Sequence, residues 1–281
     1  MPLARTSTIT AAACQNRSGV AAFNVITLEH AEGIAEGAER AGCPAILQIS
    51  ENAVRFHGGH LRPLAVAVAA VAELSAVPLS VHLDHVEDVD LLRQVDGTGI
   101  SSVMFDASRL DYEANVAATR QVAEWAHARD IWLEAELGEV GGKDGVHAPG
   151  ARTDPGEARE FVAGTTVDGL AVAVGSSHGM VDRTAALDLA LIGGLAATVP
   201  VPLVLHGSSG VSDDDLAAAV RAGIVKVNIG TVLNVAYTQA VRERLLADAA
   251  MVDPRKYVSP ARESIARQVA RIAAVVAEVR P

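Results

Sequence analysis

The stretch 201–231, VPLVLHGSSGVSDDDLAAAVRAGIVKVNIGT, contains two apolar runs, each followed by a short turn rich in glycine. Between the runs lies an amphipathic segment that begins at Ser212 and three aspartates, the pattern of a capped helix with an acidic first turn. Short apolar runs rich in Val, Ile and Leu are typical of strands buried on both faces. The stretch therefore predicts a strand–helix–strand unit with parallel strands.

The same alternation extends along all 281 residues. The predicted strands cover 20–25, 45–49, 79–83, 102–105, 131–137, 169–174, 201–205 and 224–227. The predicted helices cover 29–41, 61–75, 89–95, 111–129, 154–163, 185–197, 212–221 and 231–247, and 259–279 predicts one extra C-terminal helix. Eight units favour closure, so we expect an α/β fold, a (β/α)8 TIM barrel, as a single domain over 1–281. An open doubly wound sheet is the alternative, but no GxGxxG follows the first strand.

The composition excludes several classes of protein. The chain is 50% hydrophobic, which is enough to bury the core of one barrel. A formal net charge of -11 argues against nucleic acid as the main partner, because phosphate backbones need clusters of Lys and Arg. No long apolar run predicts a membrane span, the first twenty residues lack the apolar core of a signal peptide, and Cys14 and Cys43 form no disulfide framework. We therefore expect a soluble cytoplasmic protein with no nucleic-acid or membrane partner.

Polar residues gather where the predicted strands end, and in barrels the chemistry lies at these carboxyl ends. The segments concerned are HLDH at 82–85, GSSHG at 175–179, HGSSG at 206–210 and NIGT at 228–231, and the fifth strand contains Glu134 and Glu136. The two glycine turns that follow the seventh and eighth strands are suited to phosphate, which binds backbone N–H groups and helix N-termini.

Three histidines follow three different strands: His85, His178 and His206. In a barrel they converge, and three imidazoles with a fourth position open describe a catalytic zinc site, although cobalt or iron would also bind there. The histidines in predicted helices or a loop are expected on exposed faces: His30, His127 and His147. Asp84 is either a carboxylate that orients a ligand or a general acid/base. Neighbours on a strand face opposite sides, so Asp84 and His85 need a twist or a bulge to reach one site.

Taken in order, AFNV at 22–25, HLDH at 82–85, EAELGEVGG at 134–142, GSSHG at 175–179, LHGSSG at 205–210 and KVNIGT at 226–231 resemble the class II fructose- and tagatose-bisphosphate aldolases. The resemblance covers nearly the whole chain. It implies a zinc-dependent enzyme that reversibly cleaves a ketose 1,6-bisphosphate to dihydroxyacetone phosphate and an aldehyde. It also implies a homo-dimer or homo-tetramer and a monovalent cation, Na+ or K+, held by backbone oxygens of the glycine turns.

The resemblance further implies roles for particular residues. His85, His178 and His206 match the zinc ligands, and Asp106 and Glu136 match carboxylates at an alternate metal position or ones that orient the ligands. Asp84 matches the acid/base that acts on the C4 hydroxyl. The positions expected to contact substrate are Asn24, Ser50, Gly179, Gly207, Ser208, Ser209, Asn228, Gly230 and Thr231, of which Asn228 lies beside the enediolate.

The chain departs from the family pattern in two places. The loop Gly141-Gly142-Lys143-Asp144-Gly145 offers Asp144 where the family has a glutamate that exchanges the carbon-bound proton. Either Asp144 replaces that glutamate or the proton-transfer step differs. Near the C-terminus, Ser259 stands where some relatives have an arginine for the distal phosphate, which Arg262 or Arg55 could replace.

Other functions compete with this interpretation. An aldolase for another phosphorylated ketose or keto-acid sugar would share all the residues above. A metal-dependent barrel hydrolase would use three histidines and water, but the first strand has no HxH pair and the glycine turns would have no role. A non-catalytic phosphosugar-binding barrel predicts a broken ligand set, yet the three histidines and Asp84 are all present.

Overall fold

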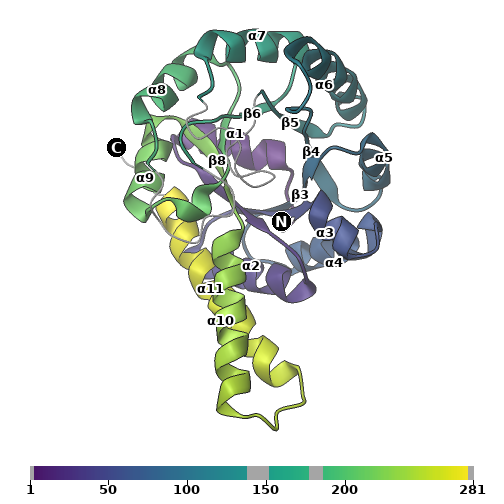
Figure 1. The fold of residues 1–281 in the computed structure, drawn as a ribbon, viewed down its shortest axis with the longest axis vertical. Helices are drawn as coiled ribbons and strands as arrows, with labels where there is room; N and C mark the ends of the chain where they lie inside the picture. The colour runs from purple at the N-terminus through teal and green to yellow at the C-terminus, as the bar shows by residue number, and fades with distance from the viewer. Residues whose placement is uncertain (1–2, 138–151, 177–185, 278–281) are drawn as a thin grey trace.

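The computed structural model describes residues 3–137, 152–176 and 186–277. Eight parallel strands form a closed barrel in chain order, each paired with its neighbour and β1 paired with β8 (Figure 1). The strands are β1 (Val20–Asn24), β2 (Ala45–Ser50), β3 (Leu79–Val86), β4 (Ile100–Phe105), β5 (Trp132–Glu136), β6 (Gly169–Ala171), β7 (Leu203–Leu205) and β8 (Ile224–Ile229). The predicted (β/α)8 barrel is therefore confirmed, and the open doubly wound sheet is excluded.

Helices alternate with the strands and cover the outside of the barrel (Figure 1). They are α2 (Leu28–Ala41), α3 (Glu51–Phe56), α4 (Leu61–Leu74), α5 (Val89–Leu92) with the 3-10 turn η1 (Arg93–Val95), α6 (Tyr112–His127), α7 (Pro155–Thr165), α8 (Leu189–Thr198), the 3-10 turn η2 (Ser208–Gly210), α9 (Asp213–Ala222), α10 (Thr231–Ala247) and α11 (Arg255–Ala277). The predicted cap is present, since Ser212 accepts from the backbone of α9, and Asp154 caps α7 in the same way.

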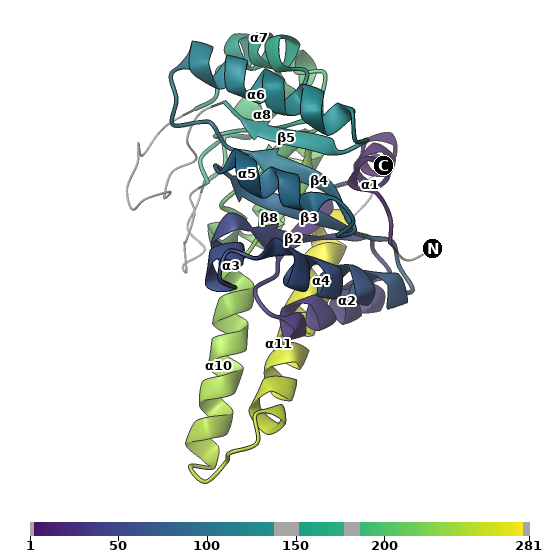
Figure 2. The same ribbon diagram turned by 90° about the vertical axis from the view of Figure 1, so that its right-hand side faces the viewer.

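Two helices were not predicted. Helix α1 (Thr6–Asn16) lies across the amino end of the barrel, at the right of the strands in Figure 2. Its buried side chains recur at Thr6, Ile9, Thr10 and Ala13, and this stripe faces the first residues of the strands. The short helix α3 begins directly after β2, where the Ser50 hydroxyl accepts from Ala53 N at 3.1 Å.

Helix α11 packs on its own barrel, as its apolar stripe predicts: Ile265, Val269, Ile272 and Val276 are all buried. Glycines on α2 allow the two helices to approach closely. A Cβ added to Gly37 would lie 2.5 Å from the Ala266 carbonyl oxygen, so a side chain at this position would separate the helices.

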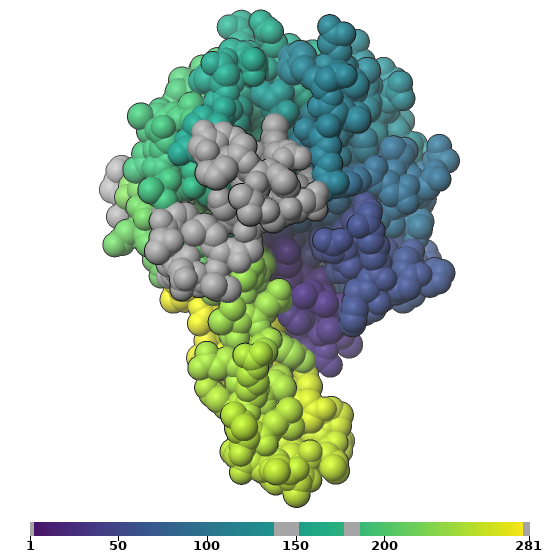
Figure 3. All heavy atoms as spheres, viewed as in Figure 1, coloured from purple at the N-terminus to yellow at the C-terminus, as the bar shows by residue number. Residues whose placement is uncertain are grey.

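The far ends of α10 and α11 form an arm that projects from the barrel (Figures 1, 2 and 3). Only Leu233 is buried among the 17 residues of α10, and Leu246 and Val252 near the tip are 86% and 90% exposed. Within the described residues, no helix has both the length and the apolar character needed to cross a bilayer.

The predicted exposure of His30 is wrong. The residue is buried because its ring stacks on Tyr237 of α10 at a centroid distance of 5.0 Å, and its Nδ1 lies 3.1 Å from Thr27 Oγ1. His127 is exposed as predicted, with Nε2 3.1 Å from Asp168 Oδ2. His147 lies outside the described residues.

Candidate active site

A polar pocket lies at the carboxyl ends of β1, β2, β3, β7 and β8. It contains about 490 Å³ of space, part of it open to solvent. The pocket is lined by Asn24, Gln48, Asp84, His85, Gly207, Ser208, Ser209, Asn228, Ile229, Gly230, Thr231 and Asn234. The tertiary structure thus brings together polar groups from five strand ends that are far apart in the sequence.

A bulge at the end of β3 directs both Asp84 and His85 into this pocket. The pairing of β3 with β4 shifts register between Leu83 and Val86, and His85 has the left-handed φ of 49°. A β-branched or bulky side chain rarely adopts this conformation, so the surrounding structure must hold it in place. The bulge is the distortion that two adjacent residues need to reach one site.

Glu51 fixes the backbone that follows His85. Its carboxylate is buried, and Oε2 accepts from Glu87 N at 2.7 Å and from Asp88 N at 3.2 Å. The other oxygen accepts from Arg55. Two backbone donors are thereby satisfied at the turn where β3 ends, which restrains the strained segment.

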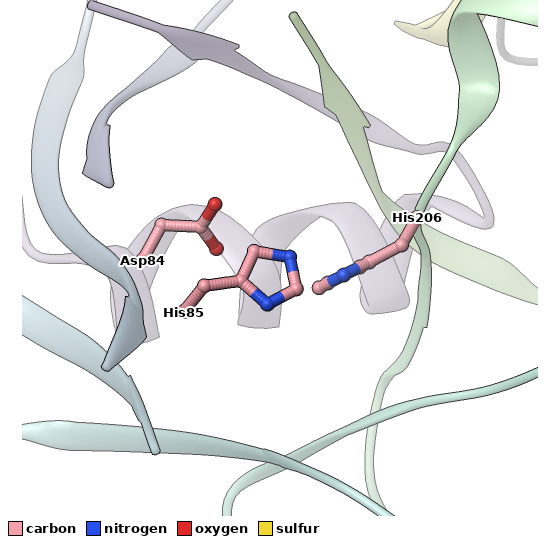
Figure 4. A group of neighbouring side chains, drawn as sticks. All are labelled: Asp84, His85 and His206. Atoms are coloured by element: carbon pink, nitrogen blue, oxygen red, sulfur yellow. The ribbon is translucent and has the colours of Figure 1, made fainter. Parts of the chain in front are cut away.

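Two groups of side chains could hold a metal ion. Asp84, His85 and His206 offer ligand atoms within 4.8 Å of one another, and so do His85, Asp106 and Glu136. In Figure 4 the His85 ring points toward His206 from the opposite strand end, with a centroid distance of 4.8 Å and an angle of 77°. His85 Nδ1 also lies 3.2 Å from Asp106 Oδ2. Imidazole nitrogens with carboxylate oxygens fit a divalent metal such as zinc.

A buried charged network fixes the orientation of His206. Lys226 Nζ donates to Glu134 Oε2 at 2.7 Å and to Asn228 Oδ1 at 2.8 Å. Because lysine only donates, the Asn228 amide turns its Nδ2 toward Asp84, 3.4 Å away. His206 Nε2 lies 2.8 Å from Glu134 Oε1. His206 Nε2 also lies 3.0 Å from Asn228 Nδ2, but the ionised Glu134 carboxylate only accepts and is the closer partner, which favours the proton on Nε2. Nδ1 is then the nitrogen that can bind a metal.

Burial and neighbouring charges set the protonation states. Burial lowers the pKa of His206 to about 4, although the hydrogen bond to Glu134 acts in the opposite direction. Burial alone would raise the pKa of Glu134, but the charge of Lys226, together with His206 and His82, outweighs it and the pKa falls to about 2. Burial also acts to raise the pKa of Asp84, and the nearby His85 is the main influence that instead holds it well below its usual range. A neutral imidazole and ionised carboxylates are the forms that bind a metal.

The two glycine turns form the other side of the pocket. Gly207 has a left-handed φ of 66°, a conformation that glycine adopts without strain. Ser208 Oγ donates to the Asn228 carbonyl, which ties the two turns together. Helix α10 begins at Thr231, so its N-terminal N–H groups lie beside the pocket, a favourable position for an anion.

Some of the predicted residues lie elsewhere. Ser50 does not line the pocket, because its hydroxyl caps α3. Arg55 pairs with Glu51, and Arg262 donates to Glu32 Oε2 at 2.7 Å, so neither arginine lines the pocket. The predicted residues outside the described part of the chain are His178, Gly179 and Asp144.

The sequence analysis missed three polar residues. Gln48 lies in β2 and donates to Asn24 Oδ1 in the pocket, and Asn234 lies one turn into α10. Lys226 entered the sequence interpretation only as part of KVNIGT at 226–231. A single polar residue in an apolar strand, as in AILQIS at 45–50 and IVKVNI at 224–229, is the signal that could have identified Gln48 and Lys226.

The comparisons with known proteins agree with this geometry. The family described as "Fructose-bisphosphate aldolase class-II" matches residues 4–279. The fructose-bisphosphate aldolase of Staphylococcus aureus is 36% identical over 272 residues, covering 96% of this chain and 95% of that protein. The fructose-bisphosphate aldolase of Geobacillus stearothermophilus is 38% identical over 256 residues, covering 90% and 89%.

A solved structure shows the same architecture. The YdjI aldolase from Escherichia coli K12 superimposes with a TM-score of 0.85 at 29% identity, covering 99% of this chain and 98% of that one. Members of the class II family are metal-dependent, and the pocket described above has residues that can hold a metal. The chain therefore belongs to the class II fructose-bisphosphate aldolase family and is an aldolase.

Proposed function

We propose that this protein uses zinc to cleave a ketose 1,6-bisphosphate of the fructose or tagatose type, reversibly, to dihydroxyacetone phosphate and an aldehyde. The observation that supports this most directly is one pocket in which Asp84 and His85 face two glycine turns and a helix N-terminus, with the His206 ligand atom within 4.8 Å of theirs. Metal ligands and an anion site in one pocket suit a substrate that carries both a carbonyl and a phosphate.

His85 and His206 would hold the zinc ion, with His178 as the third ligand. When bound, zinc would polarise the C2 carbonyl and stabilise the negative charge that develops on its oxygen. Asp106 and Glu136 either bind the metal at an alternate position or orient His85, and the 3.2 Å contact between Asp106 and His85 supports the orienting role. The assignment of zinc rests on the nitrogen ligands.

The other pocket residues would bind and activate the sugar. Gly207, Ser208, Ser209, Gly230 and Thr231 would hold the phosphate of the dihydroxyacetone half through N–H and O–H donors, and the backbone oxygens of the same turns would hold a Na+ or K+ ion.

Cleavage then requires a base and a proton donor. Asp84, ionised at neutral pH, would take the proton from the C4 hydroxyl, after which the C3–C4 bond breaks and the aldehyde leaves. Asn228 Nδ2 would donate to the oxygen on which charge develops. Asp144 is the candidate for returning a proton to C3.

The distal half of the substrate is a second question. Both arginines considered for a distal phosphate are paired with carboxylates outside the pocket. This observation favours, as an alternative substrate, a phosphorylated ketose or keto-acid sugar without that second phosphate.

We further propose that the cytoplasmic enzyme is a homo-dimer or homo-tetramer. The arm formed by α10 and α11 supports this, because it carries exposed Leu246 and Val252 far from the barrel core. Light scattering after gel filtration would show one species of at least twice the chain mass of 29.0 kDa, and a monomer would contradict the proposal.

The catalytic proposal is tested by incubating zinc-loaded protein separately with fructose 1,6-bisphosphate, tagatose 1,6-bisphosphate and the two 1-phosphates. We expect release of dihydroxyacetone phosphate that a chelator abolishes and zinc restores. The matched control is Asp84→Asn, which keeps the shape of the side chain and should bind zinc without cleaving sugar. If the zinc-loaded wild type cleaves none of the four sugars, the proposed reaction is refuted.

A further inference from the structure

A buried chain of polar groups connects helix α1, at the amino end of the barrel, with the pocket at the other end. Thr6 Oγ1 lies 2.6 Å from Ser102 Oγ, and Ser102 Oγ lies 2.8 Å from His82 Nδ1. All three residues are 0% exposed. His82 and Ser102 are direct partners across β3 and β4, so the sheet itself fixes their contact.

The chain continues to Asp84. His82 and Asp84 are two residues apart on β3 and therefore point to the same side of the strand, into the barrel. His82 Nε2 lies 3.7 Å from Asp84 Oδ1 and makes no hydrogen bond to any described residue. A fully buried ring nitrogen without a hydrogen bond is unusual in a folded protein, so its position facing a pocket carboxylate calls for an explanation.

The tautomer of His82 follows from what surrounds it. The His82 ring is fully buried and one of its nitrogens contacts a hydroxyl, and such a site favours the neutral ring with a single N–H. Asp84 can only accept, so the favourable arrangement places this N–H on Nε2, directed at the carboxylate. Nδ1 must then accept from the Ser102 hydroxyl, and the Ser102 oxygen accepts in turn from the Thr6 hydroxyl, which lies 2.6 Å from Ser102 Oγ and also reaches Ser80 Oγ at 3.0 Å.

We infer that Thr6, through Ser102, is a positioning residue that fixes the Nε2–H tautomer of His82 and so orients the carboxylate of Asp84. The inference rests on the proposed role of Asp84 as the base for the C4 hydroxyl. The groups around a carboxylate set its orientation, and an N–H on His82 Nε2 would point at Asp84 Oδ1 from 3.7 Å, a distance at which it attracts the carboxylate electrostatically without a direct hydrogen bond. Helix α1 thus contributes to the active site without contacting substrate.

The test compares two threonines one turn apart on α1. Thr6→Val removes the hydroxyl of the chain, whereas the buried Thr10 donates only to the carbonyls of Thr6 and Ser7 in its own helix. We expect Thr6→Val to lower kcat by roughly tenfold, the effect typical of removing a group that orients an active-site side chain. KM and zinc content should be unchanged. Thr10→Val should match the wild type, and Thr6→Ser should restore kcat.

A spectroscopic readout separates this inference from the proposed reaction. In protein with ¹⁵N-labelled histidine, His82 should show a protonated Nε2 and an unprotonated Nδ1, and Thr6→Val should mix the tautomers or shift them. Should Thr6→Val fail to fold, Ser102→Ala tests the same chain and should give the same loss of kcat.

If the wild type and Thr10→Val cleave sugar and Thr6→Val does so equally well with an unchanged tautomer, the inference is overturned. If the wild type cleaves none of the sugars, the proposed function has failed, and the His82 tautomer alone tests the role of Thr6. A tautomer that differs between Thr6→Val and the wild type supports that role, and an unchanged tautomer refutes it.

Discussion

Replacing Lys226 with Met should lower the free energy of unfolding, because the change removes one partner of a buried ion pair beside the pocket. Lys226 and Glu134 are both fully buried and lie 2.7 Å apart, and Met has a similar length without the charge. The substitution leaves the Glu134 carboxylate buried, with its second oxygen deprived of the donor that Lys226 supplies. Removing one partner of a buried ion pair is strongly destabilising, because the remaining charge is uncompensated.

The magnitude can be worked out in two ways. The pKa of Glu134 falls from an ordinary 4.5 to about 2, and Lys226 is the largest cause that lowers it. At 1.36 kcal/mol for each pKa unit, this corresponds to about 3 kcal/mol of stability. Breaking buried pairs costs about 3–5 kcal/mol by comparison with measured cases. A loss of about 3 kcal/mol should lower Tm by roughly 6–12 °C in a chain of this size.

The sign of the pH dependence follows from the direction of the shift. The depressed pKa of Glu134 stabilises the wild type above pH 4.5, and this contribution is lost as the pH falls from 4.5 toward 2. In Lys226→Met the carboxyl has lost the charge that lowers its pKa, so protonation relieves the buried charge. The stability difference between wild type and variant should therefore shrink as the pH falls.

The assay is urea unfolding of the metal-free proteins at pH 7 and at acidic pH, which separates folding from metal binding. Lys256→Met is the matched control, because this lysine is exposed and the same change should cost less than about 0.5 kcal/mol. The double variant Lys226→Met with Glu134→Gln should recover part of the loss. The reasoning is refuted if Lys226→Met and Lys256→Met unfold within 1 kcal/mol of each other at pH 7.

Three further predictions follow from the structure. His206→Ala should remove zinc binding and turnover together, and a purified variant that retains a full equivalent of zinc by elemental analysis would contradict the ligand assignment. Glu51→Gln should weaken zinc binding by about 10–100-fold in competition with a chelator, because the turn after His85 loses a carboxylate acceptor. An unchanged zinc affinity would show that the bulge keeps its conformation without the Glu51 carboxylate. Gly37→Ala should lower the unfolding free energy by about 1–3 kcal/mol, because its Cβ meets a backbone carbonyl of α11. As the control, a Cβ at Gly193 in α8 meets no atom, so Gly193→Ala should stabilise the fold by up to about 1 kcal/mol. Equal thermal midpoints for the two variants would contradict the close approach of α2 and α11.

The architecture and most of the pocket could be predicted from the order of residues alone. Periodic apolar runs separated by capped amphipathic segments reflect local physical chemistry, so the eight units and the C-terminal helix could be predicted from the chain. The strand ends marked Asp84, His85, His206 and the glycine turns, because parallel strands bring their carboxyl ends to one side. Helix α1 carries a buried stripe, but two of its four buried residues are threonines, which weakens the apolar periodicity that predicts a helix.

The way in which these groups face one another depends on contacts between residues that are distant in the sequence. Strand alternation places Asp84 and His85 on opposite sides, and a bulge with a left-handed His85, held by Glu51 from helix α3, overrides it. Similarly, Lys226 and Glu134 are 92 residues apart in the sequence and become partners only when the barrel closes. Local propensity carries no information about such pairs, because their energy arises from burial and from a partner that the chain supplies at long range.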